Sequence, residues 1–158
     1  MRIAAQLLDL SIKSGKMICC AESCTGGMVA AALTDVAGSS AMFDRGFVTY
    51  TNAAKVAMLG VQQATLDAYG AVSEQVADEM AAGALAHSDA QIAIAITGIA
   101  GPGGSEHKPE GRVCFGLALG DRVTVETCEF GALGRHAVRI AARDHALALL
   151  LGAMTHDA

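Results

Sequence analysis

Two serines, a tyrosine and a lysine occur close together in the segment at positions 38–55, GSSAMFDRGFVTYTNAAK, and could together perform acyl transfer. A serine hydroxyl is a weak nucleophile until a base removes its proton, and a lysine can be that base when burial or a neighbouring cation lowers its pKa. Serine and lysine replace the Ser-His-Asp triad on several unrelated folds. Loop serines and lysines are also common as solvated surface side chains, so residue types alone leave both interpretations open.

A second segment, AESCTGG at 21–27, combines glycines with hydroxyls where a strand is expected to pass into a helix. It offers the hydroxyls of Ser23 and Thr25 beside Gly26 and Gly27. Such turns bind ligands in α/β proteins because backbone N–H groups and the positive end of a helix point into one crevice. The segment is equally compatible with a capped helix start whose glycines pack against the sheet.

A third segment, TGIAGPGGS, has the composition of an anion-binding loop. It lacks the lysine of a Walker A loop, because Gly104 stands at that position, and it does not match G-x-G-x-x-G. Backbone N–H groups in such a loop can still surround an anion, and simple loop flexibility is the alternative. The candidate binding residues here are Thr97, Gly98, Gly101, Gly103 and Gly104.

Arginines provide a further candidate anion site. Arg135 and Arg139 lie four positions apart in an expected helix, so they share one face and could bind a phosphate or carboxylate, although such pairs are often solvated. A Ser-His-Asp triad is disfavoured, because Ser23 lacks the flanking glycines of G-x-S-x-G and the histidines lie at helix ends, in a polar loop, on the last helix or in the tail. These are His87, His107, His136, His145 and His156.

The cysteines do not indicate a metal site. They form no paired C-x-x-C modules and have no histidine at the spacing of a zinc site. The five are Cys19, Cys20, Cys24, Cys114 and Cys128. We therefore expect no metal and no cofactor.

Composition restricts the class of protein. The 158 residues are 53% hydrophobic and 17% charged, which argues against disorder and predicts a single domain over 1–158. The net charge of −5 disfavours nucleic-acid binding, although local groups can still hold a small phosphate-bearing ligand. No signal peptide or spanning segment is visible, so we expect a cytoplasmic protein without a membrane partner, and a homo-oligomer is compatible with its size.

The hydrophobic pattern predicts helices that alternate with strands. The expected helices lie at about 2–14, 25–34, 73–87 and 135–154, with another starting at Thr51 or Asn52. The expected strands lie at 16–21, 46–50 and 91–97, followed by an antiparallel hairpin that turns at Gly120-Asp121. This order predicts an α/β fold, a three-layer α/β/α sandwich around a mixed sheet.

The chain resembles the CinA C-terminal domain family, also known as the PncC family, in three segments taken in order: AESCTGG at 21–27, GSSAMFDRGFVTYTNAAK at 38–55 and TGIAGPGG at 97–104. The likeness covers about residues 3–152 and corresponds to the stand-alone form of the family. It implies an amidase that converts nicotinamide mononucleotide and water to nicotinic acid mononucleotide and ammonia.

The resemblance also implies a Ser/Lys mechanism in which Ser40 is the nucleophile, Lys55 the base and Tyr50 an assisting hydroxyl, with Ser39 as the neighbouring alternative to Ser40. The substrate phosphate could lie at Gly26-Gly27, at the third glycine segment or at the two arginines. Two alternative functions remain at this stage: a nucleotide-binding module without catalysis, and an amidase for another small carboxamide.

Overall fold

The computed structural model describes residues 2–156 and is built around a five-stranded sheet of order β2-β1-β3-β4-β5. The strands are β1 (Ile18–Glu22), β2 (Phe43–Val48), β3 (Ile92–Gly98), β4 (Arg112–Leu119) and β5 (Arg122–Glu129). β1 pairs in parallel with both β2 and β3, whereas β4 pairs antiparallel with β3 and β5. The sheet is therefore mixed, as the sequence predicts.

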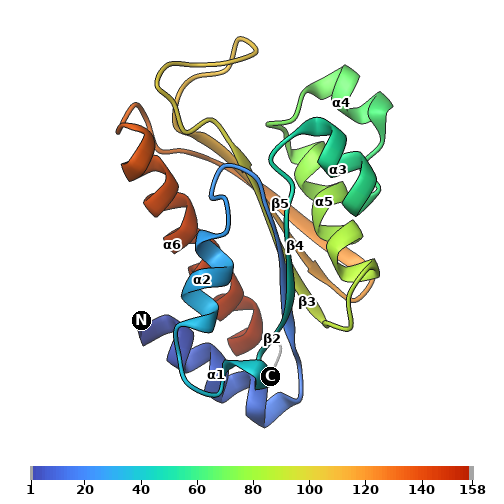
Figure 1. Ribbon diagram of the computed structural model, residues 1–158, viewed down its shortest axis with the longest axis vertical. Helices are drawn as coiled ribbons and strands as arrows, with labels where there is room; N and C mark the ends of the chain where they lie inside the picture. Colours follow the sequence, from blue (N-terminus) through green and yellow to red (C-terminus); the bar gives the residue numbers. More distant parts are fainter. Residues whose placement is uncertain (1, 157–158) are drawn as a thin grey trace.

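Helices cover both faces of this sheet (Figure 1). One face carries α1 (Arg2–Ser14), α2 (Met28–Thr34) and α6 (Arg135–His156). The other carries α3 (Asn52–Leu59), α4 (Gln63–Tyr69) and α5 (Glu74–Ala86). A short 3-10 helix, η1 (Ser39–Ala41), precedes β2. The predicted three-layer α/β/α sandwich is confirmed. None of the helices in the described residues is long and apolar enough to cross a membrane.

Large and small residues alternate along β3 and determine how closely helices pack on each face of the sheet. Ile92, Ile94 and Ile96 belong to the core that contains α6, whereas Ala93 and Ala95 belong to the core that contains α5. Because alanine projects little from a strand, α5 can lie close to the sheet. β1 and most of β3 are buried on both faces, which explains their near-continuous apolar sequences.

The main differences between the structure and the predicted elements lie at three places. α4 was not predicted, β2 begins at Phe43 rather than Gly46, and α2 begins at Met28 rather than Thr25. The late start of α2 has a clear cause, because residues 23–27 form a turn that the Glu22 carboxylate holds by hydrogen bonds. The predicted hairpin is confirmed, with β4 ending at Leu119 and β5 beginning at Arg122.

Candidate active site

Ser23 and Lys55 meet where β1 and β2 end. Ser23 directly follows β1, and its N–H donates to the carbonyl of Ile96 in β3, which fixes its position above the sheet. Lys55 lies in the first half of α3, which Thr51 caps by accepting a hydrogen bond from an N–H of the first turn. The Lys55 Nζ donates to the Ser23 Oγ at 3.1 Å and to the Thr49 carbonyl at 2.9 Å.

The Lys55 amine is buried, and its hydrogen-bond partners are uncharged. Its side chain is only 1% exposed, and both hydrogen-bond partners are neutral oxygens. Burial lowers the pKa of Lys55 below the ordinary value for lysine, because removal from water disfavours the charged form; electrostatic interactions with Cys24 and Glu106 act in the opposite direction. A buried amine with a lowered pKa thus lies within hydrogen-bond distance of the serine hydroxyl.

Glu22 holds the turn that presents Ser23. Its carboxylate is fully buried and accepts hydrogen bonds from the Thr25 hydroxyl and from the N–H groups of Gly27, Val29 and Ala30. These bonds satisfy donors at the start of α2 that would otherwise lack partners. Because the Thr25 hydroxyl donates to Glu22, it points into the protein, and Thr25 does not line the cavity.

A cavity of about 390 Å³ opens beside the Ser23 and Lys55 contact, a size suited to a small-molecule ligand. The glycine-rich third segment, Tyr50 and Arg135 are among the residues that line it. Of the residues predicted from sequence, the cavity is lined by Ser23, Tyr50, Lys55, Thr97, Gly98, Gly101, Gly103, Gly104 and Arg135.

The two predicted arginines have different roles. Arg135 lines the cavity and donates to the Tyr50 hydroxyl and to the Gly101 carbonyl. Arg139 instead donates to the carbonyls of Cys24 and Thr25, so it stabilises the turn that carries Ser23. The arginines therefore form no joint clamp in this structure.

The glycine loop already binds an internal anion. Gly103 adopts a φ of 78°, and its N–H donates to the Glu110 carboxylate at 2.7 Å. The same carboxylate accepts from the N–H of Gly134 at 3.1 Å. Thr97 is buried and donates its hydroxyl to the Ala71 carbonyl, so it anchors the loop. The Gly103 N–H is therefore used by the protein's own Glu110 carboxylate, and the predicted binding of a ligand anion by this loop stays a prediction.

Ser40 lies far from Lys55, which corrects the predicted pairing of these two residues. Ser40 is exposed in η1, ahead of β2, whereas Lys55 follows the other end of that strand. The six residues of β2 alone span roughly 20 Å at about 3.3 Å per residue. Ser39 shares the position of Ser40 in η1. The hydroxyl that contacts Lys55 belongs to Ser23 instead.

Comparison of the sequence with models of known protein families identifies the family of this chain. A family model described as the CinA C-terminal domain matches residues 1–154. The chain belongs to the CinA C-terminal domain family.

Two relatives and one solved structure are similar to this chain over most of their own length. A nicotinamide-nucleotide amidohydrolase PncC from Escherichia coli K12 is 50% identical over 153 residues, covering 95% of this chain and 92% of that protein. The protein of the same name from Enterobacter agglomerans is 57% identical over 130 residues, or 81% of this chain and 79% of that protein. The crystal structure of CihA, a competence/damage inducible protein from Agrobacterium tumefaciens, has a TM-score of 0.92 at 48% identity and covers 96% of this chain and 93% of that chain.

Two residues that organise the site in this CinA C-terminal domain escaped the sequence analysis. Glu22 was assigned only to a turn, and Glu110 was not considered. The available signal for Glu22 was its place at the end of an apolar strand, where a side chain is expected to be buried. A buried carboxylate without hydrogen-bond donors is strongly unfavourable, so donors had to lie nearby. Nothing in the sequence pairs Glu110 with Gly103 and Gly134.

Proposed function

We propose that this CinA C-terminal domain hydrolyses the carboxamide of nicotinamide mononucleotide, yielding nicotinic acid mononucleotide and ammonia, through Ser23 and Lys55. The contact between the buried Lys55 Nζ and the Ser23 Oγ at the cavity carries this proposal. The names of relatives at 50–57% identity support the choice of a nicotinamide nucleotide as substrate.

The reaction follows from the positions of these two side chains. Lys55 in its neutral form takes the hydroxyl proton of Ser23, and the Ser23 oxygen attacks the carboxamide carbon to form a tetrahedral intermediate. The C–N bond then breaks as Lys55 returns the proton to the leaving nitrogen, which departs as ammonia. Water, activated by the same amine, cleaves the acyl-enzyme ester and regenerates the serine hydroxyl.

The cavity walls support the remaining steps of the proposed reaction. We assign the stabilisation of the oxyanion to backbone N–H groups of the glycine-rich segment that lines the cavity, other than that of Gly103, which donates to Glu110. Arg135 supplies a positive charge at the same cavity, which suits the substrate phosphate. Tyr50 is 54% exposed and bonded to Arg135, so we assign it to substrate contact at the rim rather than to proton transfer.

The test compares three variants in an assay of ammonia release from nicotinamide mononucleotide. Ser23→Ala and Lys55→Ala should each lower kcat by about 10³-fold or more, because they remove the nucleophile and the base. Ser40→Ala is the matched control, and it should keep turnover within about twofold of the unchanged protein because its hydroxyl lies outside the cavity. Circular dichroism checks that each variant is folded.

Wild-type turnover in a folded Ser23→Ala variant would remove Ser23 from the mechanism. A substrate panel of nicotinamide, its riboside and its mononucleotide separates this activity from that of an amidase for another carboxamide. Binding of the mononucleotide without release of ammonia would reject catalysis and leave a binding module.

A further inference from the structure

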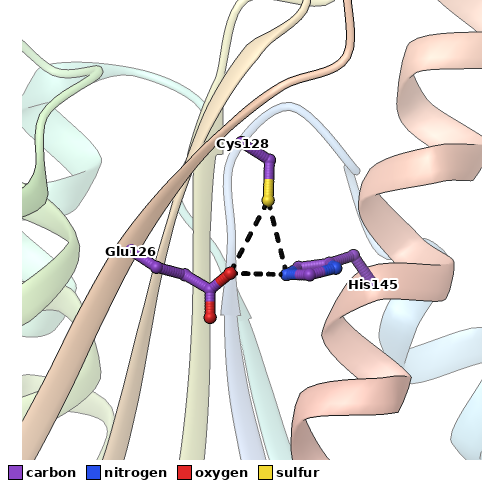
Figure 2. A group of neighbouring side chains, drawn as sticks. All are labelled: Glu126, Cys128 and His145. Carbon is purple, nitrogen blue, oxygen red and sulfur yellow. Dashed lines mark hydrogen bonds and ion pairs between the residues drawn. The ribbon is translucent and has the colours of Figure 1, made fainter.

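Three potential metal ligands converge on the side of the sheet that faces α6, away from the candidate active site. Glu126 and Cys128 are two residues apart in β5 and therefore project to the same face of this edge strand. His145 reaches them from α6, and Figure 2 shows the three side chains pointing toward a common centre. None of the three lines the cavity beside Ser23.

The distances between their ligand atoms match one face of a tetrahedral zinc site. The His145 Nε2 lies 2.9 Å from the Glu126 Oε2 and 3.4 Å from the Cys128 Sγ, and the Sγ lies 3.7 Å from the same Oε2. Ordinary zinc–ligand bond lengths in tetrahedral geometry require about 3.3 Å for N to O and about 3.5 Å for both S to N and S to O. Each observed distance is within a few tenths of an ångström of that geometry.

Aromatic packing fixes the imidazole in the orientation a metal would need. The His145 ring lies 4.6 Å from the Phe115 ring and 6.2 Å from the Phe130 ring, measured between centroids. These contacts hold the ring while its Nε2 faces the carboxylate and the sulfur. A ligand that is already oriented loses little conformational freedom on metal binding.

The site is open enough to receive an ion from solvent. The side chains of His145 and Glu126 are 30% and 45% exposed, which leaves access for the ion and space for a water molecule. A site with three protein ligands and one water is an ordinary zinc arrangement. A thiolate, an imidazole and a carboxylate together suit zinc better than the hard cations calcium and magnesium, which prefer oxygen ligands.

We propose that Glu126, Cys128 and His145 bind one zinc ion, with water as the fourth ligand. Cys128 releases its thiol proton to solvent as the zinc–sulfur bond forms. The ion joins the edge strand β5 to α6 and thereby stabilises the C-terminal helix on the sheet. The spacing of cysteines and histidines along the chain does not reveal this site, because its ligands come from two different elements and Cys128 and His145 lie seventeen positions apart.

The direct test measures zinc binding to the full chain, purified without a polyhistidine tag and stripped of metal with a chelator. Competition with a chromophoric zinc indicator should give one zinc ion per chain, and zinc should raise the melting temperature. Cobalt(II) at the same site should show the thiolate-to-cobalt charge-transfer absorption of a cysteine ligand. Loss of a direct ligand in Cys128→Ser or His145→Gln should weaken zinc binding by more than about 100-fold, since even outer-shell changes cost 10- to 100-fold.

Matched variants keep the test specific. Cys114→Ser and His156→Gln change the same residue types in β4 and in α6, outside the cluster, and should leave zinc affinity within about twofold. Glu126→Gln covers the case in which a Cys128 or His145 variant fails to fold, because its side chain is partly exposed and its size is unchanged. Substoichiometric zinc binding by the unchanged protein, or unchanged affinity in Glu126→Gln and Cys128→Ser, would overturn the proposal and leave a hydrogen-bonded trio.

Discussion

At the scale of single residues, Lys55 is an ionisable side chain that is almost completely buried. Lys55 is among the largest fully buried side chains of the described residues, and its neighbours Ser23 and Thr49 offer it only neutral oxygens. Burial disfavours the charged form of the amine in such surroundings. The same burial that opposes the charged form thus prepares the amine to accept a proton.

The pH dependence of the reaction should follow the ionisation of Lys55. The base form is neutral, so kcat/KM should rise with pH as Lys55 loses its proton and fall as the amine becomes charged at lower pH. Because burial lowers the pKa of Lys55, the midpoint of this rise should lie below the ordinary lysine value of 10.5. Initial rates of ammonia release across the pH range measure this, and a midpoint at or above the ordinary value would contradict the assignment of Lys55 as a buried base.

Arg135 should recognise the phosphate of the proposed substrate. Arg135→Ala should raise KM for nicotinamide mononucleotide by about 10- to 100-fold, the worth of a hydrogen bond to a charged group, and leave kcat less affected. The riboside, which lacks the phosphate, should react with the variant and the unchanged protein at similar kcat/KM. An equal loss with both substrates would instead assign Arg135 to holding Tyr50 and the Gly101 carbonyl.

The sequence could identify Lys55 and the cavity-lining glycines but not the serine that contacts the lysine. Ser40 is nearer to Lys55 along the chain, yet a parallel strand separates the two. Ser23 is 32 positions away and becomes a neighbour because β1 and β2 pair in parallel and end at the same edge of the sheet. Pairing of strands, rather than spacing along the chain, determines which hydroxyl is in reach.

At the scale of elements, the position of α3 depends on a close contact with α5. Gly83 of α5 lies against the carbonyl of Leu59 in the last turn of α3, and a Cβ atom at Gly83 would lie 1.9 Å from that oxygen. Lys55 lies one turn earlier in α3. A displacement of α3 would therefore move the amine relative to Ser23.

Two glycine-to-alanine substitutions in helices should change the free energy of unfolding in opposite directions, because only Gly83 lies against a neighbouring helix. Gly83→Ala should lower the free energy of unfolding by about 1–3 kcal/mol, because the added methyl forces α3 and α5 apart, and it should also slow ammonia release. Gly152→Ala in α6 should raise the free energy of unfolding by about 0.5–1 kcal/mol, since no atom lies within 4 Å of the new methyl and alanine favours helix. Urea denaturation measures both values, and a stabilising Gly83→Ala would show that the contact can relax without loss.

Element boundaries were predicted best where burial is uniform. The central strand at 91–97 and the hairpin turn at Gly120-Asp121 follow directly from apolar runs and turn chemistry. α4 escaped because it is only seven residues long and Leu66 is its only fully buried residue, which gives too weak a period to recognise. The start of α2 was misplaced because the Glu22 carboxylate satisfies the first N–H groups from outside the helix.

At the scale of the whole molecule, the two helix layers are joined through a single sheet. The core that contains α1, α2 and α6 and the core that contains α5 pack against opposite faces of the same strands. Neither layer can leave without exposing apolar residues of β1 and β3, which are buried on both sides. The two cores should therefore lose their structure together.

Unfolding should accordingly occur in one cooperative transition. The chain has no tryptophan, so the fluorescence of its two tyrosines and far-ultraviolet circular dichroism are suitable probes. Tyr50 and Tyr69 report on the end of the molecule near α3 and α4, whereas circular dichroism reports on all helices. Separate midpoints for the two probes would show that one layer unfolds before the other.

The meeting of Ser23 with Lys55 joins these layers in one more way. Ser23 lies in the turn that leads into α2, and Lys55 belongs to α3 on the opposite face, so the pair is assembled over the edge of the sheet from both sides. If only one helix layer has packed on the sheet, Ser23 lacks its lysine partner, or the Lys55 amine is still exposed to water and its pKa is not lowered by burial. The contact between the two side chains would then form only with the last docking step, and partly folded copies would lack the proposed pair of nucleophile and base.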